Sequence, residues 1–217
     1  MRKKKFTMWH RKEADKTITL KFEAEMELEL QNLFYLLYET QIYHLWFPNC
    51  KKATLVHSFN KTSRMLHAEL ATPGLMANRE TIMHSVWADR LEREGRIFIL
   101  AKSVNHLSEL MGVQVPSLPK GRVALDVKFF GFEIAPGRET TLIRSVFNFN
   151  PHVKFVPQWL LNVVNKHFGK MLFERMLKQS RGLKPSIRRT LSKIQDREAA
   201  NSFYDWILTA VEGYLRK

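Results

Sequence analysis

The side chains that most often carry catalysis are scattered along this sequence and form no recognised catalytic motif. The eight histidines make no H-E-x-x-H pattern, and the glycines make neither a G-x-G-x-x-G loop nor a G-x-x-x-x-G-K loop. There is also no G-x-S-x-G turn. Cys50 is the only cysteine, and no base can be assigned to it, which favours a buried, unreactive thiol over a nucleophile. We therefore expect no metal site, no cofactor and no covalent catalysis.

Two strongly basic stretches lie near the ends of the chain. The sequence has 35 lysine and arginine residues against 21 aspartate and glutamate residues, a formal net charge of +14. Residues 1–16 hold seven of the basic residues, and residues 178–197 hold another seven. Basic patches attract phosphate backbones or anionic bilayer surfaces, although a solvated, solubilising surface explains them equally well. No helix-turn-helix, zinc-finger or RNA-recognition pattern accompanies the charge, so we expect no nucleic acid partner.

The composition is that of an ordinary globular protein. Of the 217 residues, 45% are hydrophobic and 26% are charged. No run approaches the roughly 18 apolar residues that span a bilayer, and no apolar signal core follows the basic N-terminus. A single cysteine fits a reducing compartment. We expect one main domain in a cytoplasmic monomer that is peripheral to membranes.

Hydrophobic periodicity predicts a definite order of strands and helices. Strands are expected at residues 17–23, 51–59, 64–70, 79–88, 96–104, 122–134 and 140–149. Helices are expected from residue 30 to 37, 39 to 47, 157 to 179 and 186 to 215. The inward phase of the strand at 122–134 changes after Phe129, which predicts a bulge around Gly131. A long loop rich in glycine and proline is expected at 105–121.

The order of these elements determines the expected fold class. Consecutive strands joined by short turns argue against a parallel sheet. The sequence therefore predicts an α+β fold in which a curved antiparallel sheet wraps around a long C-terminal helix.

Several short motifs along the chain occur in a familiar order. They are Leu-Trp-Phe-Pro-Asn at 45–49, His-Ala-Glu-Leu at 67–70, Met-Ala-Asn-Arg-Glu at 76–80, Ile-Leu-Ala-Lys-Ser-Val at 99–104, Asn-Pro at 150–151 and Val-Pro-Gln-Trp-Leu-Leu-Asn at 156–162. From Ile18 to Gln179 this order resembles a START domain, the StAR-related lipid-transfer family with the helix-grip fold. The residues around Asn78 and Trp159 are similar to phosphatidylcholine-transfer-type members. The chain departs from the family pattern at Glu80, where aspartate is common, and at 150–153, where the usual glycine is absent.

The resemblance implies a non-enzymatic protein that encloses one lipid in an apolar cavity beneath a C-terminal lid helix. On this view residues 1–16 form a basic N-terminal segment, 17–180 the START-like lipid-binding domain and 181–217 a basic, amphipathic helical extension. The expected partners are a lipid ligand and, transiently, an anionic membrane surface. A phospholipid is favoured, and a sterol or ceramide remains an alternative.

The resemblance also points to the residues that would line the cavity. Arg79 is the first candidate to bind a phosphate, or to pair with Glu69 in a purely structural role. The weaker polar candidates are Tyr43, His84, Ser103 and Asn105. The apolar lining is expected from Leu125, Val127, Phe129, Ile143, Phe147, Phe149, Leu161, Val164 and Phe168. For each of these, ordinary core packing is the alternative.

The loop at 105–121 is unusually apolar for a surface loop. In the lipid-binding interpretation it forms a gate that touches the bilayer, and the candidate residues are Leu107, Leu110, Met111 and Val113. The alternative is a loop that packs against the lid helix. Two other functions stay open: a basic adaptor with a vestigial cavity, and a cyclase-type enzyme on the same fold.

Overall fold

The computed structural model describes residues 6–15, 17–72, 77–150, 152, 169–194 and 197–217. Its helices are α1 (Leu30–Tyr38), η1 (Thr40–Ile42), α2 (Tyr43–Trp46), α3 (Leu91–Glu94), α5 (Gly169–Arg181), α6 (Pro185–Leu191) and α7 (Arg197–Arg216). Its strands are β1 (Phe6–Lys12), β2 (Ile18–Met26), β3 (Cys50–Asn60), β4 (Ser63–Leu70), β5 (Arg79–Arg90), β6 (Arg96–Ser103), β7 (Glu109–Leu110), β8 (Val113–Gln114), β9 (Val123–Ala124), β10 (Asp126–Pro136) and β11 (Thr141–Asn150).

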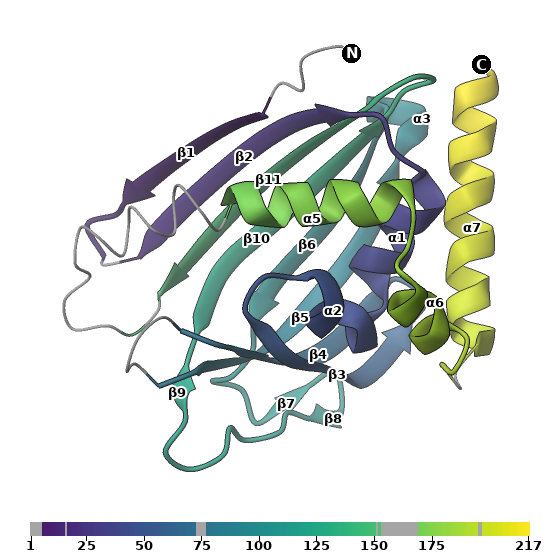
Figure 1. Cartoon of the computed structure of the whole chain (residues 1–217). Helices are drawn as coiled ribbons and strands as arrows, with labels where there is room; N and C mark the ends of the chain where they lie inside the picture. Colours follow the sequence, from purple (N-terminus) through teal and green to yellow (C-terminus); the bar gives the residue numbers. More distant parts are fainter. Residues whose placement is uncertain (1–5, 16, 73–76, 151, 153–168, 195–196) are drawn as a thin grey trace.

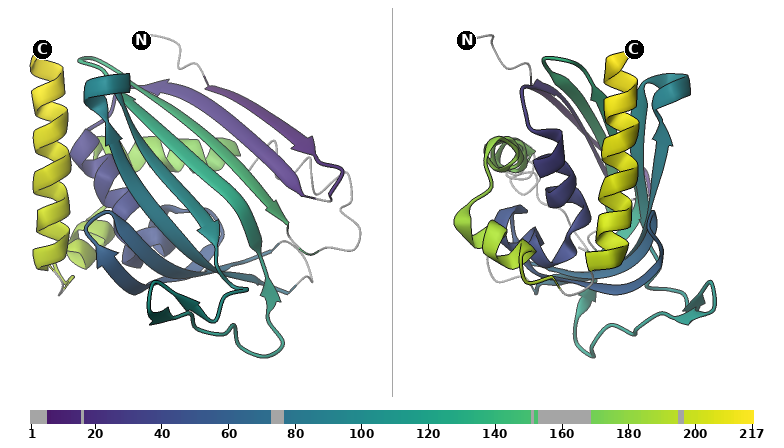
Figure 2. Two further views of the ribbon diagram at one scale, coloured as in Figure 1. Left: turned by 180° about the vertical axis from the view of Figure 1, so that it is seen from behind. Right: turned by 90° about the vertical axis from the view of Figure 1, so that its right-hand side faces the viewer.

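The larger sheet has the strand order β1-β2-β11-β10-β6-β5-β4-β3, with every neighbouring pair antiparallel. Short β9 adds a parallel pair to the start of β5. The sheet is strongly twisted, and α1, α2 and α5 lie on one side of it (Figures 1 and 2). We call this side the inner face and the opposite side the outer face. The predicted antiparallel α+β arrangement is confirmed.

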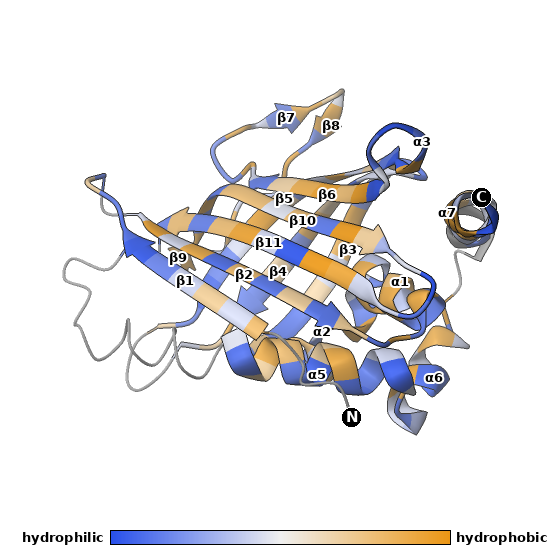
Figure 3. Ribbon diagram, turned by 90° about the horizontal axis from the view of Figure 1, so that it is seen from above, coloured by the Kyte–Doolittle hydropathy of each residue, from blue (hydrophilic) through white to orange (hydrophobic). Residues whose placement is uncertain are grey.

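Alternation along the strands explains which side chains turn inward. Hydrophobic and hydrophilic residues alternate along much of the sheet (Figure 3). In β2, for example, Ile18, Leu20, Phe22, Ala24 and Met26 are buried, while the residues between them are half-buried or exposed. The seven strands expected from this pattern are confirmed. Strand β1 was not expected, because its lysines and arginines resemble a solvated tail, yet such residues are typical of an edge strand.

The bulge in β10 lies earlier in the chain than expected. The pairing of β10 with β11 shifts between Val127 and Phe129, so Phe130, and not Phe129, continues the inward row. Phe129 is 45% exposed on the outer face, and its assignment to the cavity lining was wrong. The Phe129 ring lies over Gly131, where a Cβ atom would be 2.9 Å from the tip of the ring.

The main hydrophobic core joins the inner face of the sheet to α1, α5 and α7. Helix α5 contributes Leu172, Phe173, Met176 and Leu177 to it, the apolar stripe expected of an amphipathic helix. The part of the predicted lid helix before Gly169 lies outside the described residues. The single helix expected at 186–215 was wrong, because α6 and α7 are separate helices.

Helix α7 is part of the same core. The Phe203 ring is fully buried and stacks on Tyr38 of α1 at a centroid distance of 3.8 Å. The Tyr204 hydroxyl donates a 2.6 Å hydrogen bond to the buried carboxylate of Glu39, and burial raises the pKa of Tyr204 above its ordinary value. Helix α7 therefore packs onto α1 through aromatic and hydrogen-bonding contacts.

The loop at 105–121 covers part of the outer face. Its half-buried side chains pack against a second hydrophobic cluster that includes Met65 of β4 and Ile82 of β5. The β7–β8 hairpin within the loop has Met111 at its tip, with a left-handed φ of 50°. The loop is thus anchored to the outer face of the sheet.

Candidate functional site

The inner face of the sheet keeps an accessible apolar region beside the main core. A separate cluster of buried residues lies there, formed by Ile18, Leu20, Leu125, Val127 and Phe149. Half-buried Met83, Phe130 and Phe147 pack against this cluster. These side chains keep accessible surface although they point to the side of the sheet that carries the helices.

The predicted lining residues divide between this region and the main core. Leu125, Val127 and Phe149 belong to the inner cluster, and Phe147 packs against it. Ile143 is fully buried in the main core. Leu161, Val164 and Phe168 lie outside the described residues. Phe130 lies in this region and was missed because the bulge was placed too late.

One cross-strand row on the inner face combines a cation with short side chains. Arg64 on β4 pairs in register with Ser85, which pairs with Ala101, which pairs with Phe130. Phe147 continues the row on β11. The short side chains of Ser85 and Ala101 thus separate a charged group from a pair of aromatic rings. This row on the inner face therefore has a polar end at Arg64 and an apolar end at Phe130 and Phe147.

Arg64 is the most unusual residue of this face. Arg64 is only 6% exposed. Its guanidinium carbon lies 4.0 Å from the centroid of the Tyr38 ring. Nη1 donates a 2.5 Å hydrogen bond to the Tyr38 carbonyl. Nε is buried with no hydrogen-bond partner among the described residues. A buried donor without a partner is costly, so this nitrogen is available to an acceptor that is not part of the described chain.

Other buried polar atoms on this side share the same property. Thr81 Oγ1 and Ser145 Oγ on the strands lack a partner within the described part of the chain, as do Thr40 Oγ1, Gln41 Oε1 and Trp46 Nε1 on the η1–α2 segment above them. Buried polar side-chain atoms are normally hydrogen-bonded. The presence of several such unpaired atoms on this side of the sheet indicates that water or a polar group of a ligand binds there.

The side chains of Arg79 and Glu69, which were expected as a possible pair, point to opposite faces of the sheet. Arg79 is in register with Leu70 and its guanidinium donates to the carbonyl of Ala77. Burial lowers the pKa of Arg79 below its ordinary value. Glu69 is in register with Glu80 on the outer face. The assignment of Glu69 to the cavity was therefore wrong.

On the outer face Glu69 belongs to a network of charged residues. It accepts a 2.7 Å hydrogen bond from Asn78, and its carboxylate lies 3.7 Å from the guanidinium of Arg122. Arg122 also pairs with the buried carboxylate of Glu80 at 3.1 Å, and Glu80 contacts His67 at 2.8 Å. The network fastens the end of the 105–121 loop to β4 and β5.

His84 was also wrongly assigned to the cavity. Strand β5 turns its even-numbered residues outward, and His84 Nε2 lies 2.8 Å from Ser63 Oγ on that face. Partial burial and, secondarily, the charge of Lys102 lower the pKa of His84 below its ordinary value. Its neighbour Ser85 faces inward instead.

The remaining polar candidates have structural partners. Tyr43 donates a 2.7 Å hydrogen bond to the carbonyl of Leu37, and burial raises the pKa of its hydroxyl. Ser103 faces inward but bonds both the N–H and the carbonyl of Val127 beside the bulge. Asn105 accepts from the N–H of Ile82 and donates to the carbonyl of Leu125. These contacts position the strands around the inner cluster.

The four candidate gate residues lie on the outer side of the sheet. Leu107, Leu110 and Val113 pack half-buried on the outer cluster, and Met111 is 67% exposed. The alternative, packing against the lid helix, concerns a helix whose residues before Gly169 lie outside the described structure, so it stays a prediction. The role of the loop as a gate stays a prediction as well.

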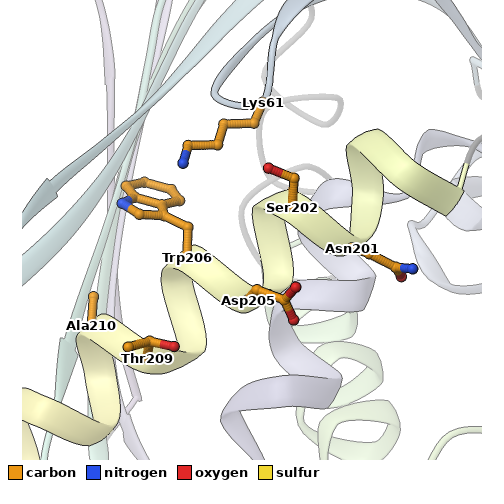
Figure 4. A pocket seen from close by; sticks show the side chains of 7 residues that line it. All are labelled: Lys61, Asn201, Ser202, Asp205, Trp206, Thr209 and Ala210. Carbon is orange, nitrogen blue, oxygen red and sulfur yellow. The ribbon is translucent and has the colours of Figure 1, made fainter.

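A surface pocket, widely open to solvent, lies between α7 and the β3–β4 turn. Its lining residues are Lys61, Asn201, Ser202, Asp205, Trp206, Thr209 and Ala210 (Figure 4). Lys61 Nζ lies 5.4 Å from the centroid of the Trp206 ring. This pocket is separate from the inner face.

Within the described residues, no group of three histidine, cysteine, aspartate or glutamate residues is arranged to hold a metal ion. No described helix is both long and apolar enough to cross a bilayer.

Comparison with known proteins identifies the fold. No protein-family model and no curated protein matches the sequence. Human STARD10 superposes with a TM-score of 0.64 at 17% identity, covering 81% of this chain and 69% of that chain. Human StAR-related lipid transfer protein 5 gives a TM-score of 0.63 at 15% identity and 81% coverage of both chains. The lipid transfer and protein localization domain of human StarD13 (DLC2) gives 0.57 at 16% identity, covering 82% and 90%. The chain therefore has the START-like helix-grip fold that its motifs predicted.

Proposed function

We propose that this chain binds one lipid against the inner face of its sheet and exchanges it at membrane surfaces. The observation that carries the proposal is the accessible apolar region around Phe130 and Phe147, which has a buried cation in the same cross-strand row. The fold it shares with lipid-transfer proteins supports the same function. A phospholipid is favoured over a sterol or a ceramide, because a phosphate would use the cation.

The apolar region would hold the hydrocarbon part of the ligand. Transfer of a CH₂ group from water to such a surface contributes about 0.8 kcal/mol. The aromatic rings of Phe130 and Phe147 contact each other edge to face, with centroids 5.9 Å apart. They present a continuous apolar wall beside Met83. A single acyl chain along this wall would gain several kcal/mol from desolvation.

The polar head group of the lipid would be bound by Arg64, with Arg79 as a second cation. An arginine fork matches the oxygens of a phosphate and is stronger where water is excluded. Arg64 is the better candidate of the two because Nε has no protein acceptor in the described structure. Thr81 and Ser85 on β5 would supply neighbouring hydroxyl groups.

A role as an enzyme has less support. Among the inward positions of the described strands β2, β4, β5, β6, β10 and β11 there is no imidazole, and the one carboxylate is Asp89 at the end of β5, which accepts a hydrogen bond from the N–H of Leu91. A cyclase needs general acid and base groups close to its substrate. We therefore propose that the protein is not an enzyme. We propose further that it is a cytoplasmic monomer that acts at the membrane periphery.

Native mass spectrometry of the purified protein, followed by lipid extraction, tests the proposal. We expect one bound lipid class at stoichiometric occupancy. Phe130→Ser should lower the occupancy at least tenfold, whereas Phe129→Ser, which changes the adjacent residue on the outer face, should leave it unchanged. If the wild-type protein is empty and takes up no lipid from vesicles, the basic adaptor becomes the better explanation.

The same measurement separates the two arginines. Arg64→Met should change the head-group class that is bound, or lower phospholipid occupancy, more strongly than Arg79→Met. If both variants keep the occupancy and selectivity of the wild type, the role proposed for a buried cation is wrong.

A further inference from the structure

The outer face carries an exposed apolar row that the lipid-binding inner face does not require. Val86 on β5 is in register with Leu100 on β6, and Leu100 with Gly131 on β10. The register continues from Gly131 to Val146 on β11, then to Lys21 on β2 and Trp9 on β1. The Phe129 ring covers the Gly131 position. We call Trp9, Val86, Leu100, Phe129 and Val146 the outer apolar row.

Exposure singles out this row within the described structure. The large hydrophobic residues that are exposed there are Trp9, Val86, Leu100, Met111 and Phe129. Four of these five are in the row, with exposed fractions of 36–47%, and Met111 is the tip of the hairpin on the same face. In the view from behind, the described helices leave this part of the sheet uncovered (Figure 2, left). Exposed apolar residues gathered in this way mark an interaction surface.

The charges on either side of the row differ. On one side, Arg144 pairs with Glu23 and Glu133, and Arg96 also pairs with Glu133, so these charges balance. Within the row, Lys21 is exposed and its Nζ lies 5.0 Å from the centroid of the Trp9 ring. On the other side, Arg11 pairs with Glu13, whereas exposed Lys102 is in register with His84. Lys21 and Lys102 therefore add two exposed basic groups to the apolar row.

We propose that the outer apolar row docks on an anionic lipid bilayer. From the spacing of strands and residues, the row is about 24 Å long and about 7 Å wide, far smaller than the roughly 800 Å² per partner of a stable protein complex. A bilayer surface accepts such a strip, because aromatic and aliphatic side chains enter it singly and lysines pair with its head groups.

This inference rests on the proposed function only for its purpose, which is to bring the protein to the membranes where it exchanges lipid. Its physical content is independent, since docking concerns the outer face and lipid occupancy the inner one. A failure of either can be recognised separately.

A fluorescent probe placed on each side of the molecule tests the docking. Val86→Cys puts a thiol in the row, and Lys178→Cys puts one on the exposed side of α5. Cys50 is buried, and its burial raises the pKa of its thiol to about 11, so it should react with the label much more slowly than an exposed cysteine. An environment-sensitive dye at residue 86 should shift to the blue with phosphatidylcholine–phosphatidylserine vesicles but not with phosphatidylcholine alone. The dye at residue 178 should not shift.

Paired charge variants give a second measure in vesicle co-sedimentation. The double variant Lys21→Gln, Lys102→Gln should lower the vesicle partition coefficient roughly tenfold. Each lysine near an anionic surface contributes favourably to the free energy of membrane binding. Lys178→Gln with Lys184→Gln removes the same charge from the helix side of the molecule, away from the outer apolar row, and should have little effect. Equal losses in the two pairs, a shift only at residue 178, or no binding to anionic vesicles would each overturn the proposal.

Discussion

Strand β6 has apolar residues on both of its faces, but those on one face are buried and Leu100 on the other is exposed. Ile97 and Ile99 point inward and are 0% and 6% exposed, whereas Leu100 points outward and is 44% exposed. The residue types are nearly the same, so hydrophobicity alone does not separate core from surface. The difference lies in what covers each face, since helices cover one and no described helix covers the other. This contrast leads us to assign lipid binding to the inner face and membrane docking to the outer face.

The arginines of the two faces show the same contrast in polar form. On the outer face, Arg144 donates to Glu23 at 2.6 Å and to Glu133 at 3.1 Å, and the hydrogen bond to Glu23 is the main cause that raises the pKa of Arg144. On the inner face, Arg64 has a carbonyl and a ring as neighbours and an unused Nε. The charges of Arg144, Glu23 and Glu133 satisfy one another within the protein. Arg64 Nε has no acceptor among the described residues, which is why we propose that the head group binds there.

The largest expected effect compares adjacent residues of β6. Ile99→Ala should lower the free energy of unfolding by about 2–5 kcal/mol, because it leaves a cavity in the core. Leu100→Ala should lower it by less than about 1 kcal/mol, because the side chain is already partly in water. Urea denaturation of the two variants measures both values. Similar losses would mean that the outer face is covered in solution.

Much of this contrast could be predicted from the sequence, because alternation is a direct consequence of strand geometry. It placed Leu125, Val127 and Phe149 on the inner face correctly. It failed at Phe129, because an inserted residue reverses the phase and the consecutive rings of Phe129 and Phe130 do not show where. The extra contact of Phe129 with Gly131 exists only in three dimensions.

The polar part of the site was predicted less well, although a signal was present. Leu66, Ala68 and Leu70 lie at alternate positions of the strand predicted at 64–70, and the same parity turns Glu69 outward and Arg64 inward. The resemblance to a family drew attention to Glu69, and arginine is normally taken for a surface residue. The unsatisfied Nε of Arg64 depends on distant Tyr38 and could not be inferred from local sequence.

Arg64→Met should separate stability from binding. Removing a buried, incompletely paired guanidinium should change the free energy of unfolding of the lipid-free protein by at most about 1 kcal/mol, or even raise it. Thermal denaturation of delipidated protein provides the measurement. A loss of several kcal/mol would show that the protein itself satisfies Arg64 and would remove the reason for assigning it to a ligand.

The pH dependence of stability should reveal His84 on the outer face. Because its pKa is lowered in the folded protein, the unfolded chain binds the proton more readily, and stability is lost as pH falls below about 6.5. His84→Gln should reduce the slope of unfolding free energy between about pH 7 and pH 5. His106→Gln, an exposed residue of the 105–121 loop, is the matched control and should keep the wild-type slope. An unchanged slope in His84→Gln would mean that the imidazole is as accessible as in the unfolded chain.

The smallest expected effect concerns the contact that fixes the exposed position of Phe129. Gly131→Ala should lower stability slightly, by less than about 1 kcal/mol, because the new methyl group displaces the Phe129 ring from the strand. In a Phe129→Ala background the same change should instead be neutral or stabilising, since alanine reduces the backbone entropy of the unfolded chain. A double-mutant cycle measured by urea denaturation gives the coupling. A coupling near zero would show that the ring does not lie over Gly131, and the outer apolar row would then be interrupted at its centre.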